Sequence, residues 1–246
     1  PTTPHVMPDD IPPASRCDPP ENYPQKHRWI VLLLLSLTVS LSVAQAWRNP
    51  GALKQQLSAR FGAERLPLLS DWLSMIASAS TLKEDARLER VNNFINRRIA
   101  FDDDISVWEK SDYWATPLET IGQGSGDCED LAIIKYVSLR MAGVPARKLR
   151  LIYAKARVQG VDGPISLAHM VLAYYATPDA APLILDNLNG AILPAAQRKD
   201  LHPIFSFNSD AIFAGVSGRN QATEGGIGRL SRWEDVWRRI LAEGYE

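Results

Sequence analysis

Cysteine and histidine are scarce in this sequence, and neither sign of charge is in excess. The 246 residues include 2 Cys and 4 His, and 27 Lys and Arg nearly balance 28 Asp and Glu. A balanced charge gives no basic surplus of the kind that indicates nucleic acid binding, and no polybasic face for anionic lipid. We therefore expect neither nucleic acid nor a lipid surface as a partner.

The first 46 residues differ from the rest and are predicted to be an N-terminal extension that includes a signal peptide. Residues 1–24 hold 8 of the 17 prolines and show no apolar periodicity, so they cannot bury a core. Basic residues then precede an uncharged stretch with an apolar core at 29–43, which ends in small residues. This order predicts export and cleavage after Ala46, with a transmembrane anchor over 29–47 as the alternative.

Cleavage there leaves residues 47–246, a length sufficient for one domain with a sizeable core. This mature chain keeps one cysteine, Cys128, because Cys17 leaves with the leader. A single thiol in an oxidising compartment cannot form an internal disulfide. A free cysteine is most often a small buried hydrophobic residue, so a catalytic interpretation of Cys128 depends on its neighbours.

Apolar residues recur every three or four positions in the first half of this domain, which predicts helices. Helices are expected over 51–63, over 65–78, from 83 onward and, briefly, after Pro117. A glycine-rich turn at 122–126 opens directly onto Cys128, where another predicted helix begins that Gly143 ends. Cys128 is therefore expected at or near a helix N-terminus.

The second half changes to short runs rich in branched and aromatic residues, which predict strands. Strands are expected at 148–157, 167–175, 182–186, 203–207 and 211–214. A final amphipathic helix is predicted from Ser231, whose hydroxyl is expected to cap it, with Glu234 three residues on. Helices followed by antiparallel strands predict an α+β fold in which a central helix bearing the cysteine packs against a β-sheet.

A catalytic thiol needs a lowered pKa and a base that holds its proton. A helix N-terminus supplies the first through its dipole, and the N–H of Cys128 could also receive an oxyanion. His169, on an alternating strand, is the stronger candidate base, and His202, in a charged loop, is the weaker one. Asp186 ends the next strand, and if the two strands pair it can lie beside His169 and orient the imidazole.

The segment Gly126-Asp127-Cys128-Glu129-Asp130 with a helix behind it, followed by His169 and Asp186 on successive strands, resembles the bacterial transglutaminase-like cysteine proteinases, in particular the LapG-type periplasmic proteases. The resemblance spans the whole mature chain, including residues 114–119. It implies a transglutaminase-like, papain-like fold and a periplasmic location. It also implies that Cys128 is the nucleophile, His169 the general base and acid, and Asp186 the residue that orients the histidine.

The same resemblance implies a substrate and a regulator. Members of the family release biofilm adhesins by cutting near an Ala-Ala bond in the N-terminal retention module of a large surface adhesin. The implied regulatory partner is an inner-membrane cyclic-di-GMP receptor whose periplasmic domain sequesters the protease. Neither partner can be inferred from the composition or spacing of the residues.

Three carboxylates, those of Asp127, Glu129 and Asp130, crowd the candidate nucleophile. Their charges would raise the pKa of the thiol unless a cation neutralises them, and oxygen ligands suit calcium better than zinc. Ordinary first-turn acidic residues, favoured by the helix dipole, are an equally good interpretation of Glu129 and Asp130. The resemblance implies a Ca²⁺ site formed by the acidic residues that flank the cysteine. A second acidic cluster, residues 102–104, could contribute, although a solvated loop is the expected state there.

Other functions remain compatible with these residues. Transamidation passes through the same acyl-enzyme, with an amine in place of water, and a cell-wall amidase would cut muropeptides. A non-catalytic binding module stabilised by calcium is an alternative of a different class. The sequence does not separate these functions from a calcium-dependent endopeptidase.

Overall fold

The computed structural model describes residues 49–213, 215–217 and 230–245. The predicted extension and signal peptide, residues 1–46 with cleavage after Ala46, lie outside the described residues. Among the helices that are described, none has the length and apolar character that crossing a bilayer requires.

The first half is helical, as the apolar periodicity predicts. It contains α2 (Pro50–Phe61), a 3-10 turn η2 (Ala63–Arg65), α3 (Leu66–Ser80) and α4 (Glu84–Arg98). Their apolar stripes meet in one core, in which Trp72, Ile76 and Val91 are fully buried. Four short elements follow: β1 (Ala100–Phe101), α5 (Asp104–Trp108), α6 (Pro117–Gln123) and β2 (Ser125–Gly126).

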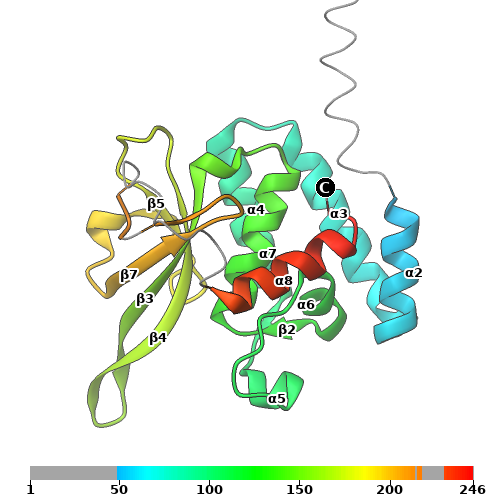
Figure 1. Ribbon diagram of the computed structural model, residues 1–246, viewed down its shortest axis with the longest axis horizontal. Helices are drawn as coiled ribbons and strands as arrows, with labels where there is room; N and C mark the ends of the chain where they lie inside the picture. Colours follow the sequence, from blue (N-terminus) through cyan, green and yellow to red (C-terminus); the bar gives the residue numbers. More distant parts are fainter. Residues whose placement is uncertain (1–48, 214, 218–229, 246) are drawn as a thin grey trace, which may run out of the picture. The chain divides into compact units, whose positions relative to one another are not determined.

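Helix α7 (Cys128–Met141) lies at the centre of the domain. It packs against α4 and against strand β4 (Gly163–Tyr174), and Figure 1 shows it between the helices and the sheet. Almost every side chain beyond its first turn is buried as a result. Gly143, with a φ of 91°, adopts the left-handed conformation that favours glycine just after the helix ends.

Six strands form an antiparallel sheet in the order β6-β5-β4-β3-β7-β8. In addition to β4, the sheet contains β3 (Leu149–Gly160), β5 (Leu183–Leu185), β6 (Leu193–Pro194), β7 (Leu201–Phe207) and β8 (Ile212–Phe213). The 3-10 turns η3 (Ala146–Lys148) and η4 (Ala195–Gln197) precede β3 and β7. Strands β3 and β4 form a long hairpin that extends away from the helices, at the lower left of Figure 1. The structure confirms the predicted α+β fold, with the cysteine-bearing helix against an antiparallel sheet.

Helix α8 (Ser231–Ala242) docks through aromatic side chains. The ring of Trp233 packs against Phe207 and Tyr136, and its Nε1–H donates to the carbonyl oxygen of Asn208 at 3.0 Å. The predicted cap at Ser231 is wrong, because Ser231 is already the first helical residue and the N-cap position is occupied by Leu230, without a side-chain hydrogen bond. Apolar periodicity fixes the existence of a helix better than its first residue.

Candidate active site

Cys128 is the first residue of α7, and the residue before it caps the helix. The side chain of Asp127 accepts from the backbone N–H of Asp130 at 3.5 Å, so the cysteine sits where the N–H groups of the first turn are free of helical partners. Cys128 is half-buried and lines a cleft of about 480 Å³ together with His169. A larger hollow of about 570 Å³ along α4 has neither a cysteine nor a histidine in its lining. The smaller cleft is therefore the candidate active site, because it contains the residues that could act as nucleophile and base.

Pairing of β4 with β5 brings His169 and Asp186 into contact. Leu172 pairs with Leu185, so the residue after β5 lies beside the part of β4 that carries the histidine. His169 Nε2 is 2.8 Å from Asp186 Oδ1, and the two residues are 4% and 1% exposed. Nδ1 is therefore the ring nitrogen that this contact leaves available for another partner.

The carboxylate of Asp186 is held by several donors. Its Oδ1 also accepts from the backbone N–H groups of Asn187 and Leu188, at 2.7 and 3.1 Å. Burial alone would raise the pKa of Asp186, but the hydrogen bonds and positive charges of His169 and Arg198 outweigh it and lower the pKa to about 2. Asp186 is therefore ionised at neutral pH and fixed in position.

Two buried cationic residues lie near Asp186, and neither was identified from the sequence. Arg198 Nη2 donates to Asp186 Oδ2 at 2.6 Å and to Asp200 Oδ2 at 2.6 Å. Lys135, on α7, is 1% exposed; burial lowers its pKa to about 7, while the charge of Asp186 acts to raise it. Arg198 lies in a loop, and Lys135 lies in a largely apolar helix. Neither residue has a spacing in the sequence that would connect it with His169 or Asp186.

The environment of the thiol favours its protonated form in the arrangement that the structure describes. Cys128 Sγ donates to Glu129 Oε2 at 2.9 Å. Burial, followed by the charges of Glu129 and Asp127, raises the pKa of Cys128, and only the backbone N–H of Met170 acts to lower it. A positive charge placed near the carboxylates would remove much of this effect.

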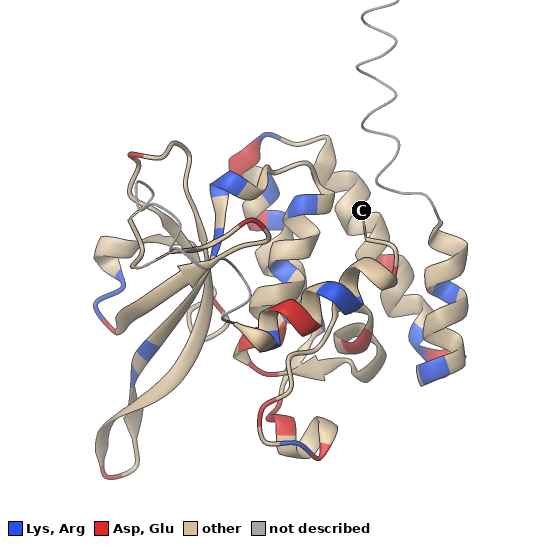
Figure 2. Ribbon diagram, viewed as in Figure 1, with Lys and Arg blue, Asp and Glu red and all other residues tan. Residues whose placement is uncertain are grey.

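The predicted acidic residues are joined by Asp104, from the second acidic cluster, and by Asp112, which no sequence pattern indicated. Single oxygens of Asp104, Asp127 and Asp130 all lie within 4.8 Å of one another, and so do oxygens of Asp104, Asp112 and Glu129. Burial and the neighbouring carboxylates raise the pKa of Asp127 to about 9 and raise that of Asp130 as well. Figure 2 shows acidic residues gathered around α5 and the segment leading to it.

Asp104 reaches this group through local pairing. Strand β1 pairs in parallel with β2, with Phe101 beside Gly126, which brings the segment after β1 next to the cysteine turn. Asp104 is buried, so the expectation of a solvated loop for 102–104 is wrong at this residue; Asp103 remains exposed and caps α5. A two-strand pairing across more than twenty residues leaves no signal in local sequence patterns.

The site has room and unsatisfied oxygens for a cation. Asp130 Oδ1 accepts from the backbone N–H of Ala115 at 2.7 Å, but its Oδ2, like Asp104 Oδ1, is buried without a hydrogen-bond partner. A Cβ at Gly126 would meet Asp130 Oδ2 at 2.6 Å, so glycine there makes room for the carboxylate. Several carboxylate oxygens without a cationic partner fit the preference of Ca²⁺ for hard oxygen ligands.

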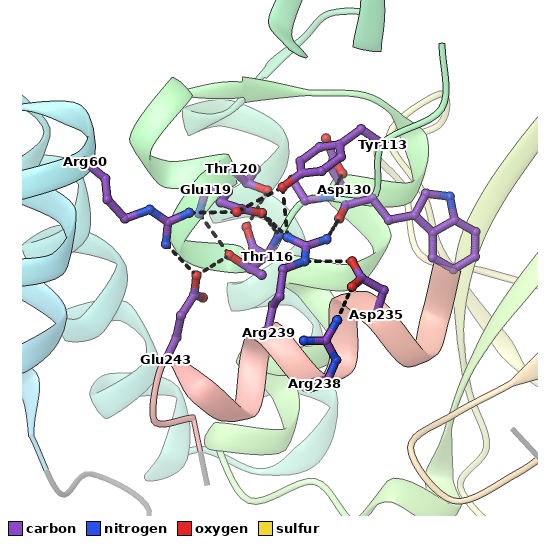
Figure 3. A network of polar contacts seen from close by, with 12 residues as sticks. Arg60, Tyr113, Thr116, Glu119, Thr120, Asp130, Asp235, Arg238, Arg239 and Glu243 are labelled. Carbon is purple, nitrogen blue, oxygen red and sulfur yellow. Dashed lines mark hydrogen bonds and ion pairs between the residues drawn. The ribbon is translucent and has the colours of Figure 1, made fainter. Parts of the chain in front are cut away.

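The loop before α6 is fixed by a second polar network, drawn in Figure 3. Glu119 closes a capping box with Thr116 and accepts from Arg60 of α2 and Arg239 of α8. Glu243 accepts from Arg60 Nη1 at 2.8 Å and from the Thr116 hydroxyl at 2.9 Å. These contacts attach both terminal helices of the described domain to the segment that precedes Cys128.

Comparisons with known proteins identify the family of this chain. Residues 73–200 match the family described as bacterial transglutaminase-like cysteine proteinase, BTLCP. A structure of EGTA-treated LapG from Legionella pneumophila is 34% identical, covers 76% of this chain and 95% of its own, and superposes with a TM-score of 0.63. A calcium-bound LapG structure from the same organism is 33% identical over 76% of this chain and 97% of its own, with a TM-score of 0.61. No curated protein matches the sequence. Since the family match covers more than half of the chain, this protein belongs to the bacterial transglutaminase-like cysteine proteinases.

Proposed function

We propose that the protein is a calcium-dependent periplasmic cysteine endopeptidase that cleaves the N-terminal region of a large surface adhesin, near an Ala-Ala bond, and so promotes biofilm dispersal. The observation that carries the proposal is the buried His169–Asp186 pair, whose histidine lines the same cleft as Cys128. A thiol, an imidazole and a carboxylate in this order are the components of a cysteine protease.

In the proposed reaction, Cys128 attacks the carbonyl carbon of the scissile peptide bond after giving its proton to His169 Nδ1. The N–H of Cys128 stabilises the oxyanion of the tetrahedral intermediate. His169 then returns the proton to the leaving amine, the C–N bond breaks and an acyl-enzyme forms. Water, deprotonated by His169, attacks the acyl-enzyme and releases the carboxylic acid and the thiol. Asp186 holds the imidazole through Nε2 throughout.

The residues that would hold calcium in this proposal are Asp127, Glu129 and Asp130, joined by Asp104. When bound, the ion supplies positive charge that offsets the carboxylates beside the thiol. Asp104 and Asp130 each have a buried carboxylate oxygen without a hydrogen-bond partner, which supports this assignment. The calcium-bound state of one LapG structure supports it as well. Glu129, which accepts the thiol hydrogen bond, would then have another partner, and Cys128 would be free to pair with His169.

The adhesin, the periplasmic location and the regulator rest on likeness to LapG. The proposed regulator is the periplasmic domain of an inner-membrane cyclic-di-GMP receptor that sequesters the protease. A substrate attached to the outside of the cell agrees with an exported enzyme, which the expected signal peptide would deliver.

The test is incubation of the wild-type protein and Cys128→Ala with a recombinant N-terminal fragment of a candidate surface adhesin, with calcium and with chelator. We expect wild type with calcium to produce two fragments, whose new ends mass spectrometry assigns to an Ala-Ala bond, and Cys128→Ala to produce none. Cleavage by Cys128→Ala, or a cross-linked rather than cleaved product, would contradict the proposal.

A further inference from the structure

Strand β4 has one long edge without a neighbour. Strand β3 pairs with it over its full length, from Gly163 to Tyr174. Strand β5 pairs only with residues 172–174. Within the described part of the chain, residues 163–171 therefore have a strand on one side only, and residues 164–168 are exposed.

The parity of the backbone shows which peptide groups face this edge. The N–H of Tyr175, one residue beyond β4, donates to the carbonyl oxygen of Lys148, one residue before β3, at 2.8 Å, so the odd-numbered residues of β4 direct their peptide groups toward β3. In an antiparallel pair a residue directs both its N–H and its C=O to the same side, and successive residues alternate. Ser166 and Ala168 therefore present their peptide groups to the free edge. Pro164, which has no N–H, shares this parity and costs β3 no hydrogen bond.

The free edge runs into the cleft that contains Cys128. Ala168 lines the cleft beside His169, and an apolar wall of the same cleft carries Phe101 and Ile105, each 61% exposed. From residue 164 to residue 170 the edge spans about 20 Å, at roughly 3.3 Å for each residue of a strand. An extended segment of about six residues fits along it, with one end at the sulfur.

We propose that the free edge of β4 binds the main chain of the substrate as an added strand and delivers its scissile bond to Cys128. This inference rests on the proposed endopeptidase function and specifies its substrate class: an extended, unfolded polypeptide segment with small or apolar side chains. Main-chain hydrogen bonds at Ser166 and Ala168 supply binding that tolerates many sequences, and the apolar wall supplies side-chain selection. A folded domain cannot offer a free strand to this edge, so cleavage is restricted to linkers.

The primary experiment measures amide hydrogen exchange by NMR in full-length Cys128→Ala, with and without the adhesin N-terminal fragment. We expect the fragment to slow exchange at Ser166 and Ala168 by at least about tenfold, because their N–H groups become hydrogen-bonded. Leu167 is the internal control, since its N–H already faces β3. Unchanged exchange at Ser166 and Ala168 with a fragment that wild type cleaves would overturn the inference.

The outcomes separate this inference from the proposed function. Protection of the two amides by a fragment that wild type does not cleave supports strand addition and contradicts the endopeptidase. Neither cleavage nor protection contradicts both. Cleavage with protection elsewhere in the cleft contradicts strand addition alone.

A second test changes the substrate and the edge in turn. A cleaved peptide from the fragment, N-methylated at one residue at a time, should lose about fivefold in kcat/KM at every second position on one side of the scissile bond, because each lost hydrogen bond is worth about 1 kcal/mol. Ala168→Pro should raise KM for the unmodified peptide more than it lowers kcat, with Ser166→Pro showing a smaller change. If N-methylation lowered kcat/KM equally at successive positions, rather than at every second one, the result would contradict binding as an added strand.

Discussion

Two groups of buried or half-buried carboxylates, one centred on Glu119 of α6 and the other beside Cys128, differ in their partners. Glu119 and Glu243 are bound by the guanidinium groups of Arg60 and Arg239. Asp104, Asp127 and Asp130 form no ion pair with Lys or Arg anywhere in the described ranges. A buried charge without a partner is costly, whereas a paired one with satisfied hydrogen bonds is tolerated. The first group therefore holds the fold together, and the second is the group to which we assign the proposed calcium ion.

Removing the carboxylate charge of Glu119 should have the largest effect on stability. Glu119→Gln leaves Arg239 and Arg60 without their shared partner, and breaking such a buried pair costs about 3–5 kcal/mol. Urea unfolding measures the loss in the free energy of unfolding. The matched control, Glu234→Gln at an exposed position of α8, should change it by less than about 0.5 kcal/mol. Equal effects of the two variants would show that the network does not hold the domain together.

Asp186 is also a paired carboxylate, so removing its partner Arg198 should lower the stability of the domain. Arg198→Met leaves the buried carboxylate of Asp186 with His169 as its remaining side-chain hydrogen-bond partner among the described residues. The change is expected to cost about 2–4 kcal/mol and to lower kcat on the adhesin fragment. Arg198→Lys, which keeps the charge, should recover part of both. A loss of stability in Arg198→Met with kcat unchanged would mean that Arg198 does not position the carboxylate for catalysis.

Acid should remove the contribution of Asp186 to stability. Its folded-state pKa of about 2 lies below the ordinary value of 3.8, so this contribution is complete above about pH 4 and is lost as the pH falls toward 2. The expected loss is about 2 kcal/mol. Unfolding of wild type and Asp186→Asn as a function of pH isolates it: the difference between the two should shrink below pH 4. A difference that stays constant from pH 6 to pH 2 would contradict the lowered pKa.

The unpaired group should respond in the opposite direction from Glu119. Asp104→Asn removes a buried charge that has no cationic partner, so the calcium-free protein should become more stable by about 1 kcal/mol. The same change should reduce the rise in Tm that calcium causes. Thermal unfolding in chelator and in calcium measures both. Destabilisation in chelator would show that Asp104 is paired in a way that the structure does not record.

The comparison also explains what the sequence could and could not predict. Apolar periodicity predicted α7 and the strands, because burial of one face leaves a regular pattern. Contact between His169 and Asp186 followed from two adjacent strands, and the structure has it at 2.8 Å, whereas their catalytic roles remain predictions. Arg198 could not be identified, because a loop brings it to the site without any local pattern. The acidic cluster 102–104 was a possible contributor, but the burial of Asp104 could not be predicted, because the short β1–β2 pair brings it to the site.

The difference between the two carboxylate groups is tested most directly by calorimetric titration of calcium into the full-length protein. Wild type and Glu119→Gln, where folded, should bind one ion with the same affinity. Asp127→Asn should bind at least tenfold more weakly, because it removes one charged ligand from the group. Undiminished binding by Asp127→Asn, or no binding by wild type, would contradict the assignment of the unpaired carboxylates beside Cys128 to a calcium site.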